Sequence, residues 1–249
     1  MCGIIAAASE RNVGKLLVQG LHKMEYRGYD SAGIALHQND KIAHLRTLGK
    51  VKLLEEKMIA EKPKSKLGIA HTRWATHGEP SEENAHPHKS NDRVYIVHNG
   101  IIENYLDLKD FLKQEGYSFT SQTDSELIAH MLEYFLSKGN TMLDAMYLTK
   151  EKLDGAYAIA AIDKEDDTNI IIARSKSPLL IGVGIDEFLA ASDPLAIGQL
   201  TNEFIFLEDG DVAEISSQSY TIYDESKNKV DRETTNIDIS SQATSKGGY

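Results

Sequence analysis

The sequence predicts an α+β protein in which helices flank two stacked antiparallel sheets. Short apolar or alternating runs, which are typical of strands, occur in the N-terminal part of the chain and again after Gly155. Runs with helical spacing lie between these two groups and also near the start. Each sheet and helix carries an apolar face, and packing the sheets together with the helices outside buries all of these faces.

The first part of the chain is expected to mix strands and helices. Asn12 is suited to cap a helix, because the apolar residues that follow it fall on one face: Val13, Leu16, Leu17, Leu21 and Met24. A turn-rich loop over residues 25–33 comes next. The other elements expected here are a strand over 2–9, a hairpin of 34–37 with 42–48 turned at Asn39-Asp40, a helix over 51–60 and a strand over 66–72.

The middle of the chain is a long loop followed by helices, and the last part is β. Residues 73–92 lack apolar periodicity, and a loop of about twenty residues in a compact domain is usually functional or disordered. A strand over 93–98 is expected to end at Asn99-Gly100, and helices follow over 103–114, over 124–136 with Thr123 or Asp124 as its cap, and over 140–153. Gly182 and Gly184 suggest a bulge or a close approach inside a strand. The strands expected after the helices are 156–163, 169–174, 179–185, 187–191, 203–207, 211–215 and 219–223.

Composition and charge exclude several classes of partner. The chain has 249 residues and a net charge of −11 without a basic block, so neither nucleic acid nor an anionic membrane surface is expected to bind it. Its apolar runs are shorter than the roughly 18 residues that span a membrane. A single cysteine excludes internal disulfides and a cysteine-rich zinc site, which suits a reducing cytoplasm.

That single cysteine, Cys2, becomes the N-terminal residue if Met1 is removed. The free α-amine would then lie on the same residue as the sulfur and has a pKa of about 7.7–8.0, so it can accept the thiol proton near neutral pH. While Met1 is present this nitrogen is an amide and cannot act as a base. The alternative is that Cys2 is an inert, small apolar residue.

Polar residues gather at the ends of expected strands. Arg73 suits a carboxylate ligand because its guanidinium can bind both oxygens, although most such residues form surface ion pairs. Asp124 suits an ammonium group, or it is simply a helix cap. Asn99-Gly100 offers a side-chain amide beside an open backbone N–H, which together form either an oxyanion hole or a plain turn.

Two further residue types have simpler interpretations. The histidines His71, His77, His86 and His88 lack the spacing of a metal site, so no metal is expected and hydrogen-bonding roles are preferred. Trp74, the one tryptophan, is expected to pack in the core when it is considered alone.

Together these segments resemble the class II, Ntn-type glutamine amidotransferases. The resemblance rests on motifs in family order along the whole chain: CGI at 2–4, EYRGYDSAG at 25–33, GIAHTRWATHGEP at 68–80, NAHPH at 84–88, HNGIIEN at 98–104, TDSE at 123–126 and LDGAYA at 153–158. Within this family they are most similar to the glutaminase domains of glutamine–fructose-6-phosphate aminotransferases. The related amidophosphoribosyltransferases typically carry Gln where Tyr29 stands and Tyr where Trp74 stands.

The resemblance implies a role for each matching residue. Cys2 would be the nucleophile, and Asn99 and Gly100 would form the oxyanion hole. Trp74 would be a gate, and Arg27 would support the surroundings of the nucleophile. The residues that would bind glutamine are Arg73, Thr76, His77, Gly100 and Asp124.

The resemblance also implies a fold, a domain division and an activity. Residues 1–238 would form a four-layer αββα glutaminase domain, and the Ser- and Gly-rich residues 239–249 would begin a linker to an absent sugar-isomerase domain. The chain would hydrolyse L-glutamine to glutamate and ammonia without a cofactor. In the full-length enzyme, a homodimer, the ammonia would convert fructose 6-phosphate to glucosamine 6-phosphate. The alternatives are the glutaminase domain of an amidophosphoribosyltransferase-like enzyme and a non-catalytic glutamine-binding module.

Overall fold

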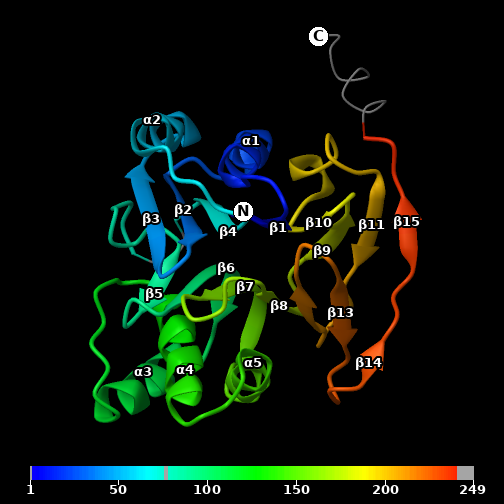
Figure 1. Cartoon of the computed structure of the whole chain (residues 1–249). Helices are drawn as coiled ribbons and strands as arrows, with labels where there is room; N and C mark the ends of the chain where they lie inside the picture. The colour runs from blue at the N-terminus through cyan, green and yellow to red at the C-terminus, as the bar shows by residue number, and fades with distance from the viewer. Residues whose placement is uncertain (1, 76–77, 240–249) are drawn as a thin grey trace.

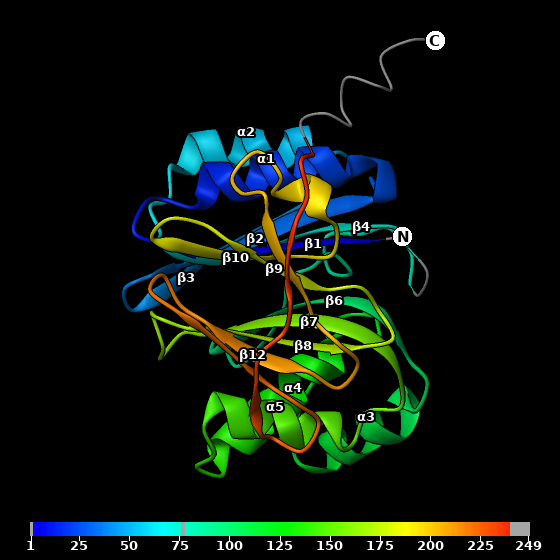
Figure 2. The same ribbon diagram turned by 90° about the vertical axis from the view of Figure 1, so that its right-hand side faces the viewer.

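The computed structural model describes residues 2–75 and 78–239, and these form four layers (Figures 1 and 2). Two helices cover the outer face of one sheet, three helices cover the outer face of the other, and the two sheets face each other. The predicted αββα sandwich is therefore confirmed. The helices are α1 (Gly14–Met24) and α2 (Val51–Glu61) on one side, and α3 (Tyr105–Gln114), α4 (Glu126–Ser137) and α5 (Met142–Lys150) on the other.

The first sheet has eight strands, and the N-terminal strand lies in its interior. Neighbouring strands are all antiparallel. Their order is β15 (Thr234–Asn236), β11 (Glu203–Phe206), β9 (Leu180–Val183), β10 (Glu187–Ala191), β1 (Gly3–Ser9), β4 (Leu67–Arg73), β2 (Ser31–Gln38) and β3 (Lys41–Leu48).

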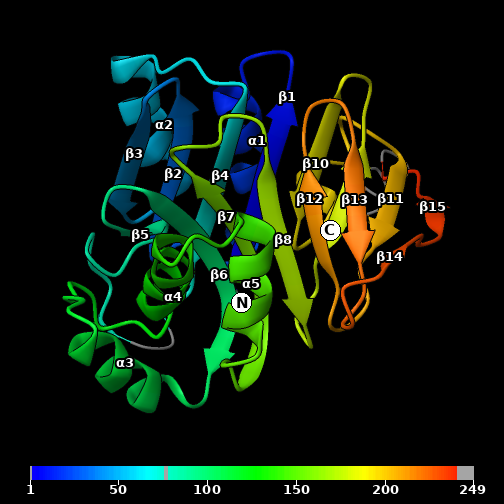
Figure 3. The same cartoon turned by 60° about the horizontal axis from the view of Figure 1, so that its bottom comes forward.

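The second sheet has seven strands and is also antiparallel throughout. Its order is β14 (Lys229–Val230), β13 (Tyr220–Tyr223), β12 (Val212–Ile215), β8 (Ile170–Ser175), β7 (Gly155–Asp163), β6 (Val94–Ile102) and β5 (His88–Ser90). Each sheet thus contains strands from before the helices α3 to α5 and strands from after them, and Figure 3 shows these strands side by side.

The hydrophobic core has three parts, one at each boundary between layers. Helix α1 buries the predicted stripe, including Leu17 and Leu21, against the first sheet. Ile4 and Val97 lie in the core between the sheets, and Met131 of α4 packs onto the second sheet. Burial from both sides explains why β1 is apolar at nearly every position.

Strand β6 is longer than the sequence predicts. The prediction that it ends at Asn99-Gly100 is wrong, because Asn99 pairs with Ala158 and Gly100 with Tyr157 on β7. Gly100 has φ +136°, and a Cβ there would lie 1.9 Å from the carbonyl oxygen of Ala156. The Asn-Gly pair therefore marks a close approach between strands and not a turn.

Most other boundaries agree with the prediction to within a few residues. Helix α4 begins at Glu126, after Asp124, and Ser125 is its cap residue. The predicted close approach at Gly182 is confirmed, because a Cβ there would lie 2.5 Å from the Ile197 side chain. The elements missing from the prediction are short: β5, β14, β15 and the 3₁₀ turns η1 (Glu25–Arg27) and η2 (Pro194–Ala196).

Two further findings concern the chain as a whole. Ile239 is buried against Gly198, so the described chain stays packed on the first sheet to its last residue. Among residues 2–75 and 78–239, the helices are too short and too polar to cross a membrane.

Candidate active site

Cys2 lies directly before β1, where the strand register brings it beside the end of β4. Gly3 pairs with Thr72, so the residues after Thr72 lie beside Cys2. The backbone N–H of Trp74 donates to the Cys2 sulfur over 3.3 Å, and the thiol lies 3.5 Å from the Trp74 carbonyl oxygen. The sulfur is thus held against the backbone at the end of a neighbouring strand.

The surroundings of Cys2 favour a protonated thiol. Burial raises the pKa of Cys2, while the Trp74 backbone N–H and the Arg73 guanidinium partly oppose this rise. A partly buried thiol with a raised pKa needs a base before it becomes nucleophilic.

Asn99 reaches Cys2 from the opposite sheet. Its amide Nδ2 donates to the Cys2 carbonyl oxygen over 3.2 Å. A primary amide carries two N–H groups, and this contact uses one of them. Gly100 follows on the same strand. Asn99 and Gly100 are therefore consecutive residues of β6, and the Asn99 amide contacts Cys2.

Arg73 ends β4 and is only 3% exposed. Its guanidinium donates to the carbonyl oxygens of Gly78 at 3.3 Å and Glu79 at 3.4 Å. Burial lowers the pKa of Arg73, whereas the charge that Cys2 carries as a thiolate and the carboxylates of Asp30 and Asp124 raise it. Since arginine ordinarily titrates above about 12, the group stays a cation.

Asp124 is buried just before α4, and the interpretation of its side chain as the cap of that helix is wrong. Its Oδ2 accepts from the backbone N–H of Ile102 over 2.8 Å, and its Oδ1 lies 3.4 Å from the Ser125 hydroxyl. Asp124 therefore ties the start of α4 to the end of β6. The buried Asp124 carboxylate is also close enough to Arg73 for their charges to interact.

Trp74 does not pack in the core as expected for a lone tryptophan. It is 43% exposed, and its ring meets that of Tyr29 edge to face with centroids 5.4 Å apart. These two rings form an exposed aromatic pair beside Cys2.

Arg27 braces the loop after α1. Its guanidinium lies 2.5 Å from the Asp193 carboxylate, which also accepts from the Tyr26 hydroxyl. The neighbouring Ser192 exchanges hydrogen bonds with the backbone of Ile4 on β1. Arg27 is thus linked through Asp193 and Ser192 to β1, the strand that follows Cys2.

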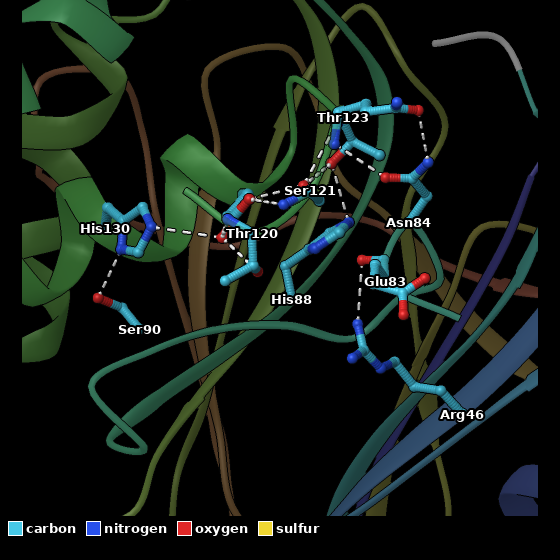
Figure 4. A network of polar contacts seen from close by, with 11 residues as sticks. Arg46, Glu83, Asn84, His88, Ser90, Thr120, Ser121, Thr123 and His130 are labelled. Atoms are coloured by element: carbon cyan, nitrogen blue, oxygen red, sulfur yellow. Dashed lines mark hydrogen bonds and ion pairs between the residues drawn. The ribbon is translucent and has the colours of Figure 1, made fainter. Parts of the chain in front are cut away.

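The loop after β4 is fastened to the segment before α4 (Figure 4). Asn84 is the main connection, because it accepts from the backbone N–H of Gln122 at 2.8 Å and donates to Glu79 at 2.9 Å. Further along, His88 contacts the Thr123 hydroxyl at 3.0 Å, and Glu126 accepts from Ser121. These contacts fix the position of Glu79, whose carbonyl oxygen accepts from Arg73, and of the segment that carries Asp124.

Two expected glutamine contacts, Thr76 and His77, lie outside the described residues. Within the part of the chain that is described, no group of three or more His, Cys, Asp or Glu side chains is arranged to hold a metal ion.

Three residues join the site that sequence reasoning did not assign to it. Asp30 accepts from the Ala75 backbone N–H at 2.6 Å, and a Cβ on Gly28 would lie 2.6 Å from the Arg73 backbone. His71 contacts the side chain of Asn99 at 3.0 Å. The dense motif at residues 25–33 was a signal for the first two, whereas nothing in the sequence paired His71 with Asn99.

Comparisons with known proteins identify relatives of this chain. A family model described as a glutamine amidotransferase domain matches residues 71–199. Glutamine–fructose-6-phosphate aminotransferase (isomerizing) from Haemophilus ducreyi is 50% identical over all of this chain, which spans 41% of that relative's length. The enzyme of the same name from Shewanella oneidensis is 47% identical with the same coverage.

A solved structure of an enzyme that is named for another activity shares the fold. The glutamine phosphoribosylpyrophosphate amidotransferase from B. subtilis superposes with a TM-score of 0.79 at 26% identity, over 92% of this chain and 50% of that one. Its lower identity means that the amidophosphoribosyltransferase alternative is not favoured.

Because burial raises the pKa of Cys2, alkylation of the folded chain that keeps Met1 should need a higher pH than alkylation of the same chain in urea. The rate of reaction with iodoacetamide, followed by mass spectrometry across pH, measures this directly, since the chain has a single cysteine. An inflection at lower pH in the folded chain would contradict the described surroundings of the thiol.

Proposed function

The chain belongs to the family of glutamine amidotransferase domains, and from that premise we propose that it hydrolyses L-glutamine to glutamate and ammonia with Cys2 as the nucleophile. The observation that carries the proposal is the position of the Cys2 sulfur. It lies against the Trp74 backbone, and the amide of Asn99 reaches the same residue from the other sheet. A nucleophile beside an amide donor suits acyl transfer.

Arg73 and Asp124 support free glutamine as the substrate. A buried guanidinium suits the α-carboxylate, and a buried carboxylate suits the α-ammonium. A glutamine residue inside a peptide lacks both charges, so this pair would select the free amino acid. Thr76 and His77 belong to the same proposal, as further contacts of the α-carboxylate.

The proposed reaction has two halves. Once Met1 is removed, the Cys2 α-amine accepts the thiol proton, through a water molecule, and the thiolate attacks the side-chain amide carbon. Asn99 Nδ2 and the Gly100 N–H donate to the oxyanion, and the proton passes to the departing nitrogen, which leaves as ammonia. Water then cleaves the γ-glutamyl thioester, which releases glutamate and restores the thiol.

The chain spans 41% of the length of the relatives described above. We therefore also propose what the full-length protein does with the ammonia. In the full-length protein the ammonia would be used to make glucosamine 6-phosphate from fructose 6-phosphate. Residues 1–238 would be the glutaminase domain and 239–249 the start of the linker. Trp74, which is exposed and follows the strand beside Cys2, would gate the path of ammonia. The full-length protein would be a cytoplasmic homodimer.

Cys2→Ala should abolish glutamate release while the variant still binds glutamine, because Arg73 and Asp124 remain in place. Calorimetry with glutamine and an enzymatic assay for glutamate measure the two properties. A non-catalytic binding module would bind glutamine in both forms and release glutamate in neither, and it would form no Cys2 adduct with a glutamine-mimicking electrophile. Equal turnover by the variant would exclude the proposed nucleophile.

Asp124→Asn tests ammonium recognition separately from structure. The variant keeps an oxygen that can accept from the Ile102 N–H but loses the charge. Since a hydrogen bond to a charged group contributes about 1.5–3 kcal/mol, kcat/KM for glutamine should fall roughly 10- to 150-fold. Glutaramate, which is glutamine without its α-amine, serves as the control substrate, and its kcat/KM should change little. An equal loss for both substrates would contradict the assignment.

A further inference from the structure

His71 makes its polar contacts at one ring nitrogen. It is a fully buried residue of β4, and its Nε2 lies 3.1 Å from the carbonyl oxygen of His98 and 3.0 Å from Oδ1 of Asn99. A carbonyl oxygen can only accept, so Nε2 must carry the hydrogen. Among the described residues Nδ1 has no hydrogen-bond partner, which fits the neutral Nε2–H tautomer.

This tautomer determines which way the Asn99 amide points. A donor at His71 requires Asn99 to present its oxygen, and the amide nitrogen then faces the other way, toward the Cys2 carbonyl. The Cys2 carbonyl also only accepts, so both ends of the amide demand the same orientation. In the reversed orientation two donors would meet at His71 and two oxygens would meet at Cys2.

We propose that His71 is a positioning residue for the reaction: its Nε2–H holds Oδ1 of Asn99, so that Nδ2 stays directed toward Cys2, where the oxyanion forms. The inference rests on the proposed function and adds a residue to it. His71 reaches the nucleophile only through the amide of Asn99, so it orients a donor and takes no part in bond making itself.

The packing behind His71 keeps its ring fixed and neutral. The His86 ring stacks on it with centroids 4.1 Å apart, and His88 follows edge to face at 4.5 Å. His88 in turn contacts Thr123, in the group of polar contacts of Figure 4. Burial lowers the pKa of His71 to about 3, so the ring stays neutral near physiological pH.

The test compares His71→Gln with His71→Asn, two uncharged amides. Gln places its nitrogen near the position of Nε2 and can still donate to Asn99, whereas Asn places its nitrogen near the position of Nδ1. Losing an oxyanion donor outright costs about 10²–10³ in rate. We therefore expect kcat for glutamate release to fall at least tenfold in the Asn variant and much less in the Gln variant, with KM nearly unchanged in both. Equal kcat values would overturn the proposal.

A double-mutant cycle separates positioning from general support of the fold. If His71 acts through Asn99, adding His71→Asn to Asn99→Ala should cost little further activity, while independent effects would multiply. A multiplied loss would overturn the proposal. His37→Asn is the matched control, since His37 is a buried histidine of β2 whose Nε2 contacts the Lys164 carbonyl at 2.8 Å. Its kcat should stay at the unmodified value.

The proposed function and this inference fail in different ways. If the unmodified, Met1-free chain releases no glutamate, the proposed function falls. The orientation of the Asn99 amide can still be read in that case from the NMR signals of its side-chain NH₂ group. These should shift in His71→Asn and not in His37→Asn, and signals that shift equally in both would overturn the positioning role.

Discussion

The site depends on the antiparallel register between β1 and β4. Because Gly3 pairs with Thr72, Cys2 meets the backbone of Trp74, and Arg73 is the last residue of the same strand β4. β1 lies between β4 and β10 and is buried on both faces, so this register is strongly specified. A shift by one residue would exchange Ile5 and Ala7, which pack in the core under α1, with Ile4, Ala6 and Ala8, which pack between the sheets, and it would move the sulfur away from Trp74.

The second sheet contributes the remaining residues of the candidate site. Asn99 crosses the interface to Cys2, and Asp124 is held by the backbone of β6 just beyond Gly100. The sulfur and Arg73 therefore belong to one layer, while the amide and Asp124 belong to the other. The apolar contact between the sheets thus does more than stabilise the fold, since it sets the distance between Cys2, the proposed nucleophile, and the groups proposed to act on its substrate.

The sequence predicted the layers and most elements, because amphipathic periodicity and turn residues are local signals. Its motifs also indicated Cys2 and Arg73. Local signals failed where tertiary pairing decides the structure. Asn99-Gly100 has the composition of a turn but lies inside β6, and Asp124 has the position of a helix cap but binds a strand. His71 could not be paired with Asn99, because only the stacking of the two sheets brings them together.

The proposed mechanism requires Cys2 to carry the γ-glutamyl group during turnover, and this intermediate can be trapped. The Met1-free chain would be mixed with ¹⁴C-labelled glutamine, quenched in acid, digested and mapped. We expect label on the N-terminal peptide, released by hydroxylamine as expected for a thioester, and little label on chain that keeps Met1. Glutamate release without label on Cys2, or full turnover by chain that retains Met1, would contradict the proposed mechanism.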